Sequence, residues 1–223
     1  MLVEENLDPD VLAAFIGGAV KVIDSLFGPA FTRMISRYAL EFESQKTGEE
    51  PPENILSVDE VINYLKERRE RYPKFYNSLI YGIAKTEKMF EGSTASGAKN
   101  LASNAIKKMI EEVGLLNEVK GKIPNIYEAL MRFIEITKSL KAASPQRIVK
   151  ESEKVILLEM EGCPWKDACE AMEREGITRL TGDPECVVLI ANSAGVSLVS
   201  GKPVDYKLEI FNEPNCKGRI FEI

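Results

Sequence analysis

The residues in this chain best suited to chemistry are four cysteines, Cys163, Cys169, Cys186 and Cys216, all in the last third of the sequence. They are separated by 5, 16 and 29 residues, so none belongs to the Cys-x-x-Cys pair that is typical of zinc ribbons. The chain has no histidine. Without imidazole, four thiolates would suit a Zn²⁺ ion or a 4Fe-4S cluster. The four cysteines are therefore the predicted metal ligands.

The local context of the cysteines adds to this interpretation. Cys163 lies at a predicted helix start, and Cys186 follows a predicted helix cap at Asp183. The positive end of a helix dipole should therefore favour both thiolates. Cys216 is expected in a turn between two strands. Two alternatives stay open: a metal-free redox pair such as Cys163 with Cys169, and four inert buried thiols.

The composition excludes several classes of protein. Without histidine, the chain cannot form a Ser-His-Asp or Cys-His nucleophile pair. Its net charge of −6 argues against nucleic acid as a partner, because binding phosphates needs a basic surface. The acidic start and the lack of an apolar run of about 20 residues predict no signal peptide and no membrane helix. We expect a cytoplasmic protein, in which cysteines are normally reduced.

The first part of the chain, up to about residue 144, is predicted to be helical. Apolar residues recur there at helical spacing, and caps such as Asp8 before Pro9 and Ser57 with Glu60 mark helix starts. The expected helices cover residues 9–27, 29–43, 57–72, 73–91, 101–113 and 125–143. A proline-rich acidic break at 48–52 separates the second helix from the third.

The character of the sequence changes at Pro145. Two β-branched runs, 147–151 and 154–161, predict a hairpin. A short helix is expected over 163–176, and a second over 183–200, although the valine-rich stretch 186–199 would also suit a strand. A closing hairpin is predicted from strands at 205–211 and 219–223.

This order of elements predicts an α+β fold. We expect a helical N-terminal segment over residues 1–91 and an α+β domain over residues 92–223. The second domain contains two helices, a hairpin that runs into a Glu-Gly-Cys-Pro turn, two further helices and a final hairpin.

The domain over 92–223 resembles the 4-vinyl reductase domain family of small-molecule-binding modules. The resemblance depends on Gly97-Ala-Lys-Asn-Leu-Ala, the strand from Val155 to Cys163, Cys186, and the final strands from Tyr206 with Cys216. The family usually has a Gly-rich segment and a second cysteine before its last strand. Here Cys216-Lys-Gly-Arg-Ile-Phe runs directly into the terminus, which leaves the identity of the ligand open.

The resemblance implies a pocket between helices and sheet, a homodimer and, in several members, a cysteine-bound metal or redox sensing. The leading expectation is a cytoplasmic protein that binds a small apolar ligand or acts as a sensor, with a four-cysteine Zn²⁺ or 4Fe-4S site. One alternative is a metal- or cluster-dependent enzyme, either a reductase or a hydrolase. Another is a metal-free cysteine redox switch.

Three further motifs have simpler interpretations. The stretch 92–99 resembles a phosphate-binding loop, but its lysine is one residue late and a helix precedes it. The basic and aromatic residues of 64–76 are explained by helical pairs such as Lys66 with Glu70. Glu159 and Glu161 are expected to be exposed charges on a strand rather than an acid and base pair.

Overall fold

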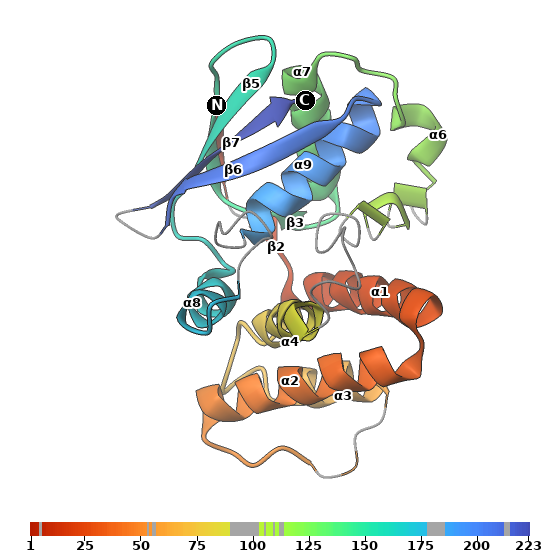
Figure 1. Ribbon diagram of the computed structural model, residues 1–223, viewed down its shortest axis with the longest axis vertical. Helices are drawn as coiled ribbons and strands as arrows, with labels where there is room; N and C mark the ends of the chain where they lie inside the picture. The colour runs from red at the N-terminus through yellow and green to blue at the C-terminus, as the bar shows by residue number, and fades with distance from the viewer. Residues whose placement is uncertain are drawn as a thin grey trace.

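The protein is built from two layers, a helical layer and a layer in which helices cover a sheet (Figure 1). The computed structural model describes residues 1–4, 6–52, 54, 57–89, 103–104, 106–108, 110–111, 114–177, 186–211 and 215–223. The α+β class predicted from the sequence is confirmed. The phosphate-loop-like stretch 92–99, the Gly97 motif and the cap at Asp183 lie outside the described residues.

The helical layer contains four helices from the first part of the chain and one from the second. They are α1 (Pro9–Phe27), α2 (Pro29–Thr47), α3 (Val58–Glu67), α4 (Tyr76–Met89) and α8 (Lys166–Arg174). Asp8 caps α1 by accepting hydrogen bonds from the backbone amides of Asp10 and Val11. Ser57 and Glu60 form the predicted capping box at the start of α3.

Close packing of α2 on α4 depends on a glycine. A Cβ atom at Gly82 would lie 2.5 Å from the backbone carbonyl oxygen of Ile35, so only glycine allows the two helices to approach this closely. Phe42 stacks on Tyr81 at the same contact, with ring centroids 4.7 Å apart. These contacts fix α4, which also contacts α1 and α8.

The second layer is a five-stranded antiparallel sheet in the order β1-β4-β5-β7-β6, with helices packed on it. Its strands are β1 (Leu2–Val3), β4 (Gln146–Lys150), β5 (Val155–Met160), β6 (Val204–Ile210) and β7 (Cys216–Glu222). Helix α9 (Val187–Ser200) contacts β6 and β7, and α7 (Ile126–Ser139) packs on α9. A short helix, α6 (Leu116–Val119), lies before α7, and a two-stranded sheet pairs β2 (Asn6–Leu7) with β3 (Ala142–Ala143).

Helix α9 resolves the ambiguity in the valine-rich stretch. The segment is helical because α7 and the sheet bury it on opposite sides, so an apolar surface all round suits it. Gly195 allows the close approach of α7, since a Cβ atom there would lie 2.5 Å from the ring of Phe133.

The outer face of the sheet carries ion pairs instead of a site. Glu159 lies 3.3 Å from Arg147 and 3.5 Å from Lys217 on the neighbouring strands. Arg219 pairs in the same way with Glu151 and Glu209. This agrees with the expectation that Glu159 is an ordinary exposed charge on a strand.

Two short strands at the N-terminus, β1 and β2, were not predicted, and the first expected helix begins after them at residue 9. These strands have two residues each, which is too short for a periodic pattern, and their partners β4 and β3 lie about 140 residues later in the chain. The first residues thus belong to the sheet layer, while α8 packs on α4 in the helical layer (Figure 1). The two layers therefore exchange segments. The predicted domain boundary at residue 91 falls outside the described residues.

The prediction of helical i,i+4 pairs in the basic stretch is also wrong. Helix α3 ends at Glu67, so the residues that follow turn toward other elements. Lys66 lies 3.6 Å from Asp10, and Arg68 lies 3.1 Å from Glu49. The basic side chains are paired, but with partners distant in sequence.

Candidate functional site

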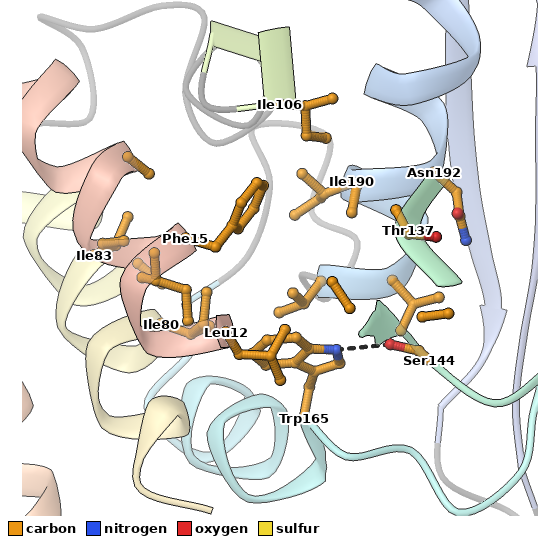
Figure 2. A pocket seen from close by; sticks show the side chains of 18 of the residues that line it. Leu12, Phe15, Ile80, Ile83, Ile106, Thr137, Ser144, Trp165, Ile190 and Asn192 are labelled. Carbon is orange, nitrogen blue, oxygen red and sulfur yellow. Dashed lines mark hydrogen bonds between the residues drawn. The ribbon is translucent and has the colours of Figure 1, made fainter. Parts of the chain in front are cut away.

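A cavity of about 160 Å³ lies between the two layers (Figure 2). The helical layer lines it with Leu12 and Phe15 of α1 and with Ile80 and Ile83 of α4. The sheet layer contributes side chains from α7, α9, β3 and β4, among them Ile190. The walls of the cavity therefore come from segments far apart in the sequence.

Five alanines line the cavity, and their small side chains leave room where apolar faces meet. On α1 the lining residues recur at helical spacing, so this face points into the cavity. Small side chains among the lining residues leave open space next to this face. The alanines that line it are Ala19, Ala84, Ala142, Ala143 and Ala191.

Trp165 and Met172 close the end of the cavity near α8. The indole Nε1 of Trp165 donates a hydrogen bond to the Ser144 hydroxyl at 3.1 Å (Figure 2). Its ring meets Tyr76 edge to face, with the centroids 5.0 Å apart. Trp165 thus connects β3 and β4 of the sheet layer to α4 of the helical layer.

The hydroxyl and amide groups on the cavity wall come from the sheet layer. In Figure 2, Thr137, Ser144 and Asn192 lie on one side, opposite Phe15 and Ile83. The hydroxyl of Thr137 donates to the carbonyl of Ile134 at 3.0 Å, so its proton is already engaged. Nδ2 of Asn192 donates to Oε1 of Gln146 at 2.8 Å.

Glu87 of α4 is the one ionisable side chain among the described residues that line the cavity. It takes part in a further interaction of its own. No described lysine or arginine lines the cavity. The interior is thus apolar, with a small polar area on one wall, as is typical of small-molecule sites.

The structure places the four cysteines on four different segments near the end of the cavity. Cys163 follows β5, Cys169 lies within α8, Cys186 caps the start of α9 and Cys216 begins β7. Cys216 pairs with Met160 of β5, so the prediction that it lies in a turn is wrong, because β7 begins earlier than its apolar residues indicate. All four are free thiols.

The expectation of thiolates at helix starts is contradicted. Burial raises the pKa of the Cys163 thiol to about 11 and that of the Cys186 thiol further. Burial and then the neighbouring Cys186 raise the pKa of Cys169 well above its usual value. Backbone amides lower these pKa values, as the helix-start argument assumed, but desolvation has the larger effect. Burial therefore favours the protonated form of Cys163, Cys169 and Cys186.

The four thiols are close enough to affect one another's pKa, but they do not form a coordination sphere. Among the residues that the structure describes, no group of three or more cysteine, aspartate or glutamate side chains could hold a metal ion. The predicted metal site is thus not assembled in this arrangement.

Residue types that suggest chemistry did not reveal the cavity, although one sequence signal was present. Asn192 and Ser193 interrupt the apolar run 187–199. A buried amide in such a helix needs a partner, and the structure supplies Gln146. The space itself arises from alanines, which also occur throughout closed cores.

Comparisons with known proteins give little further information. No family model and no curated protein sequence matches the chain. A solved structure from work on heme distortion in the H-NOX family aligns with a TM-score of 0.40 and 16% identity, covering 94% of both chains. Another, on heme redox potential and porphyrin distortion, aligns with a TM-score of 0.39 and 16% identity, covering 94% of this chain and 98% of the other. Likeness at this level does not identify a ligand.

No helix within the described ranges is long and apolar enough to cross a membrane.

Proposed function

We propose that the protein binds a small apolar molecule in the cavity between its two layers. The observation that supports this is the cavity itself, about 160 Å³ and lined mostly by apolar side chains. Protein interiors hold few voids larger than a water molecule. Apolar side chains that face open space lack the packing partners of a filled core, which costs stability. A bound ligand would recover much of this cost.

The size of the cavity limits the ligand. An engineered cavity of about 150 Å³ with similar walls binds benzene or xenon. The space here suits one aromatic ring or a short branched chain. It is below the range of about 300–1,000 Å³ that is typical of pockets for drug-sized ligands.

A sensory role follows from the position of the cavity. A ligand there contacts α1 and α4 on one side and α7 and α9 on the other. Binding would therefore favour one arrangement of the two layers over others. The resemblance to the 4-vinyl reductase domain family implied a pocket within residues 92–223, whereas this cavity is also lined by α1 and α4, which lie outside that range. We also propose that the protein is a homodimer and that it is cytoplasmic. Light scattering tests whether it is a homodimer.

Heme does not fit this site. Heme iron is held by histidine, cysteine, tyrosine or a methionine paired with histidine. The chain contains no histidine. The described residues that line the cavity include no cysteine and no tyrosine. We therefore propose an organic ligand, in contrast to the heme of the two solved structures.

Thermal unfolding with and without toluene tests the proposal. We expect toluene to raise the Tm, because a ligand that binds only the folded state stabilises it. Ala191→Leu should fill the cavity, raise the Tm of the free protein and remove the effect of toluene. Ala14→Leu makes the same change on the exposed face of α1 and should leave the response intact. An unchanged Tm at saturating toluene would contradict the proposal.

A second candidate function uses the four cysteines as a Zn²⁺ or 4Fe-4S site. The mutual effect of the four thiols on their pKa values supports it, since it requires them to be near one another. A bound cation would favour the thiolates that burial now disfavours. Such a site would also allow a metal-dependent reductase or hydrolase, and without metal the same thiols could act as a redox switch.

Elemental analysis and a visible spectrum of protein purified without oxygen separate these possibilities. About one zinc per chain, or iron with sulfide and a brown colour, would support the second candidate. Cys216→Ser should then lose both metal and stability. Protein without metal would remove this candidate and leave the cavity proposal unaffected.

A further inference from the structure

We propose that the ligand is a neutral molecule with a single polar group, which the paired amides of Gln146 and Asn192 recognise. This inference rests on the proposed function, because it assumes that the cavity binds a ligand. It adds the chemical class of that ligand.

The two amides form a buried pair at the wall of the cavity. Gln146 is 3% exposed and Asn192 is 5% exposed. Their one mutual hydrogen bond, from Nδ2 of Asn192 to Oε1 of Gln146, is 2.8 Å long. Both residues also line the cavity. The pair is thus held in place at the wall of the cavity.

The mutual bond leaves hydrogen-bonding capacity unused. A carboxamide has two N–H donors and a carbonyl acceptor. Among the described residues, neither Oδ1 of Asn192 nor Nε2 of Gln146 has a further hydrogen bond. If both amide groups were turned over, Gln146 would donate the mutual hydrogen bond and Asn192 would accept it. One amide nitrogen and one amide oxygen would again be outside that bond. The pair therefore offers both kinds of partner to a ligand in either orientation.

The two hydroxyls on the same wall each have one hydrogen bond within the protein. The Thr137 hydroxyl donates to the carbonyl of Ile134, and the Ser144 hydroxyl accepts from Trp165. Figure 2 shows Thr137, Ser144 and Asn192 on the sheet-layer side and apolar side chains opposite them. A ligand would therefore place its polar group at the amides and its apolar part against α1 and α4.

Charge complementarity argues for a neutral group. No described lysine or arginine lines the cavity, so a carboxylate would be buried without a cation. Glu87 lies on the same lining and would repel an anion. Glu87 also takes part in another interaction, and benzylamine tests whether it can in addition hold an ammonium group. An alcohol, ketone or primary amide meets these conditions.

Four one-ring probes differ only in the polar group and test this inference. Toluene has none, benzamide is neutral and has donor and acceptor, benzoate is an anion and benzylamine is a cation. We expect calorimetry to give a Kd for benzamide about tenfold lower than for toluene, which is the effect of one well-placed hydrogen bond. Benzoate and benzylamine should bind more weakly than benzamide.

A double variant, Gln146→Met with Asn192→Leu, removes both amides together and leaves neither one unpaired. It should bind toluene at least as well as the original protein and lose the preference for benzamide. Thr137→Val removes a polar group on the same wall whose proton is already used, and should keep the preference. Toluene binding by the double variant shows that it is folded.

The outcomes separate this inference from the proposed function. Equal affinity for toluene and benzamide would overturn the role of the amides while the cavity proposal stands. Tightest binding of benzoate or benzylamine would overturn the neutral class. Failure of all four probes to bind would remove the proposed function, and this inference with it.

Discussion

The cavity and the cysteine cluster are neighbours in the fold but opposite in character. The cysteine cluster contains four free thiols, and no metal-binding group of three or more side chains occurs in the part of the chain that the structure describes. The cavity has space but is lined by ordinary apolar side chains and a few amides and hydroxyls. Trp165 lies between them, two residues after Cys163 and at the end of the cavity.

This difference shows that a binding site can depend on missing volume. Alanines on several elements create the space, while close packing around the thiols suppresses their ionisation. The predictions that follow separate the two regions, from the largest expected effect to the smallest.

Trp165→Ala should have the largest effect, because Trp165 serves both layers. It removes a buried ring, its contact with Tyr76 and the hydrogen bond to Ser144. We expect a loss of about 3–5 kcal/mol in the free energy of unfolding, the range for large-to-small core changes. Urea denaturation measures this loss. Trp165→Phe keeps a buried aromatic ring and should reduce the free energy of unfolding much less. Equal losses for the two variants would show that the buried ring does not account for the stability that Trp165 provides.

Stability should fall at alkaline pH because of the cysteines. Burial raises the pKa of Cys163 to about 11, whereas an unfolded cysteine titrates near about 8.5. Above that pH the unfolded chain loses protons that the folded chain keeps, so the free energy of unfolding decreases. The slope is about 1.4 kcal/mol per pH unit for each such thiol.

Urea denaturation between pH 8 and pH 10.5 measures this slope. Cys163→Ala and Cys186→Ala should each make it less steep. A free energy of unfolding that stays constant over this range would contradict the burial of protonated thiols.

Cys216→Ser should have a small effect and should separate the regions most clearly. Cys216 is half-buried at the start of β7 and does not line the cavity. We expect a loss of about 1 kcal/mol or less and an unchanged Kd for toluene. A change in toluene affinity would show that the cluster and the cavity are coupled.

Glu159→Gln on the outer face of the sheet should have the smallest effect. Its ion pairs with Arg147 and Lys217 are solvent-accessible, and such pairs contribute about 0–1 kcal/mol. Ligand affinity should not change. A loss well above this range in urea denaturation would indicate a structural role for the charged face.

Much of the fold was predictable from local patterns. The hairpin at 147–161 and the helix starts at Asp8, Ser57 and Asn125 agree with the structure, because alternation and capping act over a few residues. β1 and β2 were not predictable, since their pairing depends on strands far along the chain.

The candidate site was less predictable for a related reason. The sequence predicted that the cysteines lie near one another, and their mutual effect on pKa agrees with this. Their protonation was not predictable, because it depends on burial that only the tertiary fold creates. The cavity depends on which alanines face one another across α1, α4 and α9. Neither property is encoded in a local spacing.

A crystal structure of the protein soaked in toluene tests the central claim most directly. We predict electron density for one ring between Phe15 and Ile190, within reach of Asn192, and none in Ala191→Leu crystals treated in the same way. A cavity that stays empty at saturating toluene, in crystals that diffract well enough to show a ring, would contradict the claim that it is a ligand site.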